Sequence, residues 1–447
     1  MADHAAEPFP IEGVTTPFWM LRFDAEGNCE SEETRRKLLE TLGTESPSDV
    51  FVLAHGWNNA FDHAVGWYGT FLKELEKLPG GPPRANYRPI AVGITWPSMW
   101  FVGDDGPTFA GAESLLPPLQ KEIATRAAAT GGNGVKAERV RVLLEQPRLD
   151  RAEARELAEA MLPLLDPRGG NEVGPTDADL DANAVLTAVA DIERATSGAP
   201  PKDPNDWGEG TTNAPAGPQA AGFLDYLDPR NFVRLFSTYQ MKDRAGTVGW
   251  NGIGPLLRDI VSSSGAAHVH VVGHSYGCKV VLSAICRTED FARPLASVLL
   301  LQPAVSHLAF ASAVPGRPGP GGYVLALKSD RVRPPILSTY SARDFPLHGA
   351  FHLGMRRAED LGEATIASST ATTAGDPPSR YAALGGYGPR GCDERLRDPM
   401  PGPGQPYEFP DTPIMGVDGS NGQIGGHGDI ANANTAWALH QLAFNRP

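Results

Sequence analysis

The chain has 447 residues, enough for two or three domains or for one heavily decorated domain. Its 53 acidic residues outnumber the 39 basic ones, giving a net charge of −14, which argues against nucleic acid and anionic membrane surfaces as main partners. The 41% hydrophobic content is ordinary for a globular protein, and no apolar run is long enough for an integral membrane segment.

The start of the chain and its cysteines bear on its compartment. The first residues, MADHAAEPFPIEG, lack the basic stretch followed by an apolar one that marks a secretory signal peptide. The four cysteines have no metal-type spacing, and Cys278 and Cys286 lie about two helical turns apart, too far for an easy disulfide. We therefore expect free thiols and a cytoplasmic protein, with export by another route as the alternative.

In the first part of the chain, residues 1–102, predicted strands are followed by turns that contain candidate functional residues. Apolar runs at 18–23, 50–54 and 90–95 predict strands. The helical spacing of apolar residues over 61–77 predicts a helix between the second and third of them.

The composition changes over residues 103–245. The segments 115–130 and 137–165 predict helices, whereas 166–221 is too polar and too broken for central strands and carries one helical patch at 184–195. We expect an insertion that is part helical and part loop. It is either a lid over the site or a surface insertion without a role at the site.

Regular order is expected again from Trp250, within the last part of the chain, 246–447. A Gly/Pro/Ser-rich stretch interrupts it up to about Gly404. The alternation of strands and helices predicts an α/β fold with a largely parallel, doubly wound sheet. The expected strands are 267–273, 296–302, 336–342 and 413–418, and the expected helices are 255–262, 275–287 and 430–444.

The most informative motif is Gly-His-Ser-Tyr-Gly at 273–277, which matches G-x-S-x-G. A strand of β-branched residues precedes it and an apolar helical pattern follows it. This context is typical of a nucleophile elbow, a strained strand-to-helix turn that exposes the hydroxyl of Ser275. The alternative is a turn whose serine merely caps the helix. His274 is expected to point away from the hydroxyl in such a turn.

A second strand-to-helix turn follows the predicted strand at 50–54. His55-Gly56 turns the chain there, and a backbone N–H after such a turn can donate to a developing oxyanion. We nominate the N–H groups of Trp57 and Tyr276 as the oxyanion hole. The alternative is an ordinary turn.

A serine hydroxyl needs an imidazole to take its proton and a carboxylate to hold that imidazole. In a fold of this type both follow the serine in the chain. Asp344 ends a predicted strand and is favoured as the acid, with Asp330 as the rival. His427 is the favoured base, because a glycine loop before the last helix can carry it across the sheet edge; Asp429 is expected to cap that helix. The other histidines considered as the base are His307, His348, His352 and His440.

These motifs occur in the order HGWNN, TWPS, GHSYG, SARD and GGHGD, which resembles the α/β-hydrolase superfamily. Within it, the chain looks most like a bacterial group of α/β-hydrolases of unknown function. The resemblance covers about 50–98 and 267 to the C-terminus, not the insertion. It implies a triad of Ser275, Asp344 and His427 and ester-type hydrolysis. The chain departs from the pattern in its insertion and in the long interval from acid to base.

The expected activity is esterase- or lipase-like cleavage of a small-molecule ester or lipid. A thioesterase, acyltransferase or amidase would use the same triad, and a non-catalytic binding protein on this scaffold is the remaining alternative. No cofactor or metal is expected. His348 and His352 have H-x-x-x-H spacing but lack the glutamate of the zinc-protease motif, and the glycine-rich GSNGQIGG lacks the lysine of a phosphate-binding loop.

Overall fold

The structure, a computed structural model of the whole chain, describes most of the residues. The described segments are 7–56, 61–78, 86–98, 134–162, 181–196, 226–287, 291–316, 318–350 and 373–445.

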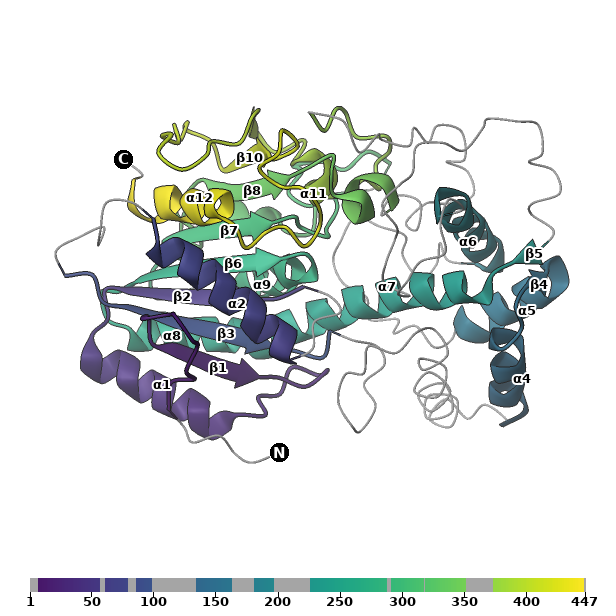
Figure 1. Cartoon of the computed structure of the whole chain (residues 1–447), viewed down its shortest axis with the longest axis horizontal. Coiled ribbons are helices and arrows are strands. Elements are labelled where there is room, and N and C mark those ends of the chain that lie inside the picture. The colour runs from purple at the N-terminus through teal and green to yellow at the C-terminus, as the bar shows by residue number, and fades with distance from the viewer. Residues whose placement is uncertain are drawn as a thin grey trace.

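A sheet of eight parallel strands lies at the centre of the described part of the chain (Figure 1). The strand order is β1-β3-β2-β6-β7-β8-β10-β9. The strands are β1 (Phe18–Arg22), β2 (Asp49–Ala54), β3 (Pro89–Thr95), β6 (His268–His274), β7 (Ser297–Leu301), β8 (Ile336–Tyr340), β9 (Arg395–Arg397) and β10 (Ile414–Asp418).

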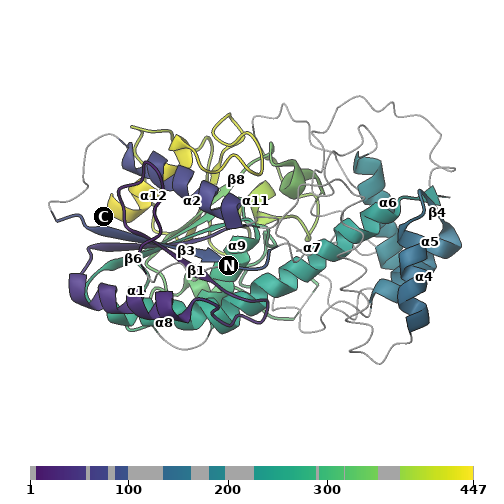
Figure 2. The ribbon, with the colours of Figure 1, turned by 60° about the horizontal axis from the view of Figure 1, so that its bottom comes forward.

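Helices cover both faces of this sheet, because alternate residues of each central strand point to opposite faces. In β2, Val50 and Val52 join the apolar core on one face, and Phe51 and Leu53 join the core on the other. The first face carries α1 (Glu32–Glu45), α8 (Gly254–Ser263) and α9 (Tyr276–Cys286), and the second carries α2 (Phe61–Glu76) and α12 (Ala433–Phe444). Figure 2 shows α1 and α8 below the sheet and α2 and α12 above it.

The prediction of an α/β fold with a mostly parallel sheet is therefore confirmed. The winding of the chain reverses between β2 and β6, since β3 and β1 extend the sheet to one side and β7, β8 and β10 extend it to the other. In open α/β sheets, ligands bind beyond the carboxyl ends of the strands at such a switch point.

The described parts of 103–245 are mainly helical. Figure 1 shows α4, α5 and α6 grouped at one end of the molecule, away from the sheet. The expected helix at 137–165 is wrong as a single element, because Pro147 cannot continue a helix and Asp150 starts a new one with a capping box. The expected helix at 115–130 lies outside the described residues. The elements here are α4 (Gly134–Leu144), β4 (Leu149–Asp150), α5 (Arg151–Met161), α6 (Ala182–Thr196) and β5 (Tyr226–Leu227).

A helix that the sequence did not predict links this group to the sheet. It is α7 (Pro229–Val248), which begins at the N-cap Asp228 and packs along α9. A π-helical turn, η4 (Gly249–Ile253), joins it to α8. Regular order therefore returns well before Trp250. The charged helix α1 was also missed, because it buries only Leu38 and Leu42.

The C-terminal part follows the prediction with local differences. The Gly/Pro/Ser-rich stretch contains η6 (Phe345–Ala350), α11 (Leu384–Tyr387) and β9. The closing helix begins at Ala433, not at Ile430, and Asn432 caps it. The expected cap at Asp429 is wrong, because that carboxylate accepts the N–H of Gly425 within its own loop (2.8 Å).

Two findings concern the chain as a whole. All four cysteines, at 29, 278, 286 and 392, are free thiols. Within the described segments, no helix combines the length and the apolar character needed to cross a bilayer.

The contact between η4 and α9 generates a test. A Cβ added at Gly249 would lie 2.9 Å from Ser283 Cβ and against the backbone of Val280, whereas a Cβ added at the exposed helical Gly66 meets no atom within 4 Å. Gly249→Ala should lower the free energy of unfolding by roughly 1–3 kcal/mol, and Gly66→Ala should raise it by about 0.5–1 kcal/mol. Urea unfolding followed by circular dichroism measures both. Equal effects of the two variants would contradict this account of the packing.

Candidate active site

Ser275 lies between the end of β6 and the start of α9 in a strained backbone conformation. Its φ is 54° and its ψ is −123°, a region that residues other than glycine rarely adopt. The side chain makes no capping hydrogen bond to α9, so Ser275 is not a simple helix cap. Its N–H donates to the carbonyl of Leu301 on β7 (3.0 Å).

Close packing of three segments surrounds this turn. A Cβ added at Gly56, after β2, would lie 2.7 Å from Ser275 Cβ. A Cβ added at Gly277 would clash with the carbonyl groups at the end of β2. Glycine is therefore required at both positions for β2, β6 and α9 to approach one another.

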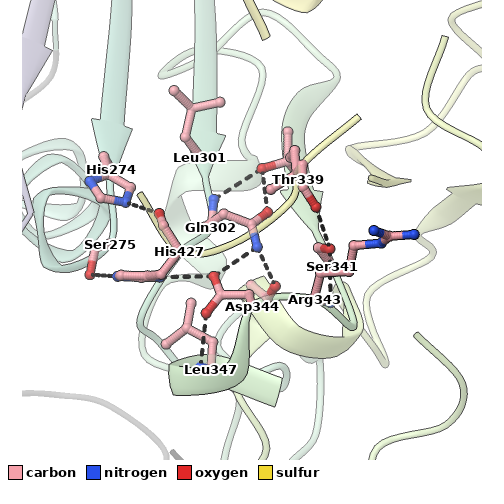
Figure 3. Close-up of polar contacts among 12 residues, drawn as sticks. His274, Ser275, Leu301, Gln302, Thr339, Ser341, Arg343, Asp344, Leu347 and His427 are labelled. Carbon is pink, nitrogen blue, oxygen red and sulfur yellow. Dashed lines mark hydrogen bonds and ion pairs between the residues drawn. The ribbon is translucent and has the colours of Figure 1, made fainter. Parts of the chain in front are cut away.

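His427 joins Ser275 to Asp344 (Figure 3). Its Nε2 lies 2.9 Å from Ser275 Oγ and its Nδ1 lies 2.8 Å from Asp344 Oδ2. The carboxylate can only accept, so Nδ1 carries the ring proton and Nε2 is free to accept from the hydroxyl. Ser275 is 3% exposed, Asp344 is fully buried, and the side chain of His427 is 27% exposed.

Asp344 is held on both of its oxygens. Oδ1 accepts the N–H of Leu347 (3.0 Å), so Asp344 also caps the turn that follows it. Oδ2 accepts both from His427 and from the side-chain amide of Gln302 (2.8 Å). Asp330 is exposed in a turn, so of the two acids considered the structure brings Asp344 to His427.

Gln302 was missed by sequence reasoning. It is fully buried and directly follows β7, the strand beside β6, which Ser275 follows. A polar residue placed right after the apolar run SVLLL was the available signal, because side chains at carboxyl ends of neighbouring strands meet at one edge.

His274 supports the base from the side of β6. Its Nε2 lies 3.0 Å from the carbonyl oxygen of His427 and donates to it, and the two rings are 4.9 Å apart. Burial, with a smaller effect of the nearby His427, lowers the pKa of His274 well below its ordinary value. A neutral His274 therefore holds the backbone of His427 in place, as expected for a side chain directed away from the serine hydroxyl.

The turn after β2 is fixed to β3 and α2. The N–H of His55 donates to Tyr68 Oη (2.9 Å), which in turn donates to the carbonyl of Ile94 (2.5 Å). Trp96 Nε1 donates to the carbonyl of His55 (3.1 Å), and the two rings stack. Trp57 lies outside the described residues, and Tyr276 is the first residue of α9. The oxyanion-hole assignment stays a prediction.

The other candidate histidines have different partners. His307 lies 2.9 Å from the carbonyl of Ala382 through Nδ1, and His348 donates from Nε2 to the carbonyl of Ala374 (2.8 Å). His440 stacks on Trp437 within α12. His352 is outside the described residues. Among the residues whose placement is described, no group of three or more His, Cys, Asp or Glu side chains is arranged to hold a metal ion.

Chemically, the arrangement can move a proton from a serine hydroxyl to an imidazole that a buried carboxylate orients. Comparison of the chain with protein-family models, with curated proteins and with solved structures gave no match.

The buried histidines of this region make stability depend on pH. Burial lowers the pKa of His55 from 6.5 to about 4, so between these values the unfolded chain binds a proton that the folded chain does not. Stability should therefore fall as the pH drops through this window, with His55 contributing about 2 kcal/mol of the loss between pH 7 and pH 5. Denaturant unfolding at the two pH values measures this, and His55→Asn should flatten the dependence by that amount. An unchanged pH dependence in His55→Asn would contradict the assignment.

Proposed function

We propose that this chain is a serine hydrolase of the α/β-hydrolase type that cleaves carboxylic esters through an acyl-enzyme. The observation that carries the proposal is the continuous hydrogen-bonded arrangement from Ser275 through His427 to Asp344. It connects a strained, buried serine to a buried carboxylate through one imidazole, which is the geometry that makes a hydroxyl nucleophilic.

The chemistry follows from the proton positions. His427 Nε2 accepts the hydroxyl proton of Ser275 as Oγ bonds to the ester carbonyl carbon, whose electron pair moves onto the carbonyl oxygen. When that pair returns, the bond to the alcohol oxygen breaks, and the alcohol leaves with the proton from His427. A water molecule then attacks the acyl carbon while His427 accepts one of its protons. The bond from that carbon to Ser275 Oγ breaks, His427 returns the proton to Oγ, and the acid leaves. Asp344 stabilises the imidazolium that forms in each half of the reaction.

Several features support the α/β-hydrolase assignment. The serine lies on a turn between a central parallel strand and the helix after it, at the point where the winding of the sheet reverses. The order along the chain is serine, acid, base, as in that fold. The parallel sheet with helices on both faces suits it as well.

The proposal names a small-molecule ester or lipid as the substrate. A thioesterase, acyltransferase or amidase would use the same three residues and differ in the pocket and in access of water. We favour ester cleavage because the motifs at 55–59, 273–277 and 425–429 resemble the α/β-hydrolase superfamily, and that resemblance implies ester-type hydrolysis.

The nucleophile is tested directly. Ser275→Ala should lower hydrolysis of activated esters by about 10⁴- to 10⁶-fold, because among the described residues Ser275 supplies the hydroxyl hydrogen-bonded to His427 Nε2. The measurement is kcat/KM against short- and long-chain esters, thioesters and amides, together with labelling by a fluorophosphonate probe. Ser283→Ala, on the same helix and hydrogen-bonded to Tyr323, is the matched control and should keep both activity and labelling.

The outcomes separate the alternatives. Cleavage of thioesters or amides in preference to every ester would replace the ester assignment but keep the triad. Labelling of Ser275 without turnover of any panel member would favour acyl transfer to an acceptor other than water. A folded wild-type protein that neither turns over nor labels would overturn the hydrolase proposal in favour of a binding protein.

The acid is tested by a matched pair. Asp344→Asn removes the charge that orients His427 and should lower kcat by about 10³- to 10⁴-fold at pH 7. Asp330→Asn changes an exposed carboxylate and should leave kcat within about twofold of the wild type. Steady-state kinetics on one activated ester is sufficient. A larger loss in Asp330→Asn than in Asp344→Asn would refute the assignment of the acid.

A further inference from the structure

Gln302 has an unusual combination of strain and burial. In the described residues, positive φ values occur at four residues other than glycine. Two of these are exposed: Ser46, which ends α1, and Asp393, which lies in a bend. The other two are Ser275 (φ 54°) and Gln302 (φ 45°), which directly follow the neighbouring strands β6 and β7 and are buried. Strained backbone in a buried position persists where the surroundings require it, and it is concentrated at functional sites.

The side-chain amide of Gln302 has its orientation determined by its partners. Oε1 accepts from Thr339 Oγ1 on β8 (2.9 Å), and the same hydroxyl oxygen accepts the backbone N–H of Gln302 (3.0 Å). Nε2 donates to Asp344 Oδ2 (2.8 Å) and to the carbonyl of Gly385 (3.0 Å). A flipped amide would direct its oxygen at two acceptors, so only one orientation satisfies the site.

Gln302 contacts the same oxygen of Asp344 that accepts the hydrogen bond from His427. Oδ2 accepts from Gln302 Nε2 and from His427 Nδ1, as Figure 3 shows. Oδ1 is bonded to a backbone N–H in the turn after Asp344, which limits rotation of the carboxylate from the other side. The amide of Gln302 is therefore the side-chain group that sets where Oδ2 stands relative to the imidazole.

We propose that Gln302 is a positioning residue of the hydrolase reaction: it holds Asp344 Oδ2 in line with His427 Nδ1 and shares the negative charge of that oxygen. This inference rests on the proposed function. The first effect keeps His427 Nε2 directed at Ser275, so its loss should lower kcat more than it raises KM. The second effect weakens the electrostatic influence of the carboxylate on His427, so altering the group at position 302 should move the pH dependence of kcat/KM.

Two isosteric variants separate these effects. Gln302→Met keeps the length of the side chain but donates no hydrogen bond, and should lower kcat roughly 10- to 100-fold with KM within about threefold. Gln302→Glu replaces the donor with a second carboxylate. Its ionised form adds negative charge near His427, so the acidic limb of the kcat/KM profile should move to higher pH.

Thr339 supplies the matched control. Thr339→Ser keeps the hydroxyl that orients the amide, so its kcat and pH profile should lie closer to those of the wild type than the values of Thr339→Val do. Thr339→Val keeps the shape but removes the hydroxyl, and should lower kcat in the same direction as Gln302→Met. Thermal melting of all four variants and titration of active serines with the fluorophosphonate probe correct each rate for the fraction of folded protein.

The possible outcomes of these experiments can be told apart. A corrected kcat loss with a shifted acidic limb in the Gln302 variants supports the positioning role. The positioning role would be overturned if both Gln302 variants had the kcat and the pH profile of the wild type. It would also be overturned if a lower fraction of active serines accounted for the whole loss of kcat. Either result would leave the hydrolase assignment intact. Failure of the proposed function itself appears differently, as a folded wild-type chain with no ester turnover and no labelling of Ser275.

Discussion

Parallel pairing of β6, β7 and β8 is the constraint on which the candidate site depends. Because these strands are neighbours and run in the same direction, the residues that follow them emerge at one edge of the sheet. Ser275 follows β6, Gln302 follows β7, and Asp344 comes shortly after β8. The pairing of the strands thus places three groups side by side that are far apart in the sequence.

His427 reaches this edge from a different direction. It lies in the loop between β10 and α12, 83 residues beyond Asp344, and β10 pairs with β8. The long interval is therefore compatible with the contact, because the chain returns in β10 to lie beside β8, the strand that precedes the acid. The loop is held by its own carboxylate, Asp429, and by the bond from His274 to the carbonyl of His427.

Seven strands of the central sheet and the three residues Ser275, Asp344 and His427 could be predicted from the sequence, because apolar runs that end in polar turns and a histidine in a glycine loop are local signals. The three-residue strand β9 was missed. Helix α7 could not be predicted, since its apolar residues become a buried face only when it packs against α9, α6 and other elements that are separate in the sequence. The contact of Gln302 with Asp344 could not be predicted either, because it depends on which strands are neighbours in the sheet. Asp429 was misread as a cap because its hydrogen bonds within the glycine loop have no sequence signature.

Burial of Asp344 makes the parts of the site depend on one another. A buried carboxylate is costly unless donors compensate it, and here the donors come from an imidazole, an amide and a backbone N–H on separate segments. Removing one donor weakens the hold of the carboxylate on the others, because all act on the same small group in a region of low dielectric constant. The arrangement that orients His427 is thus also what makes a charged Asp344 tolerable inside the protein, and stability and proposed chemistry share the same contacts at this edge of the sheet.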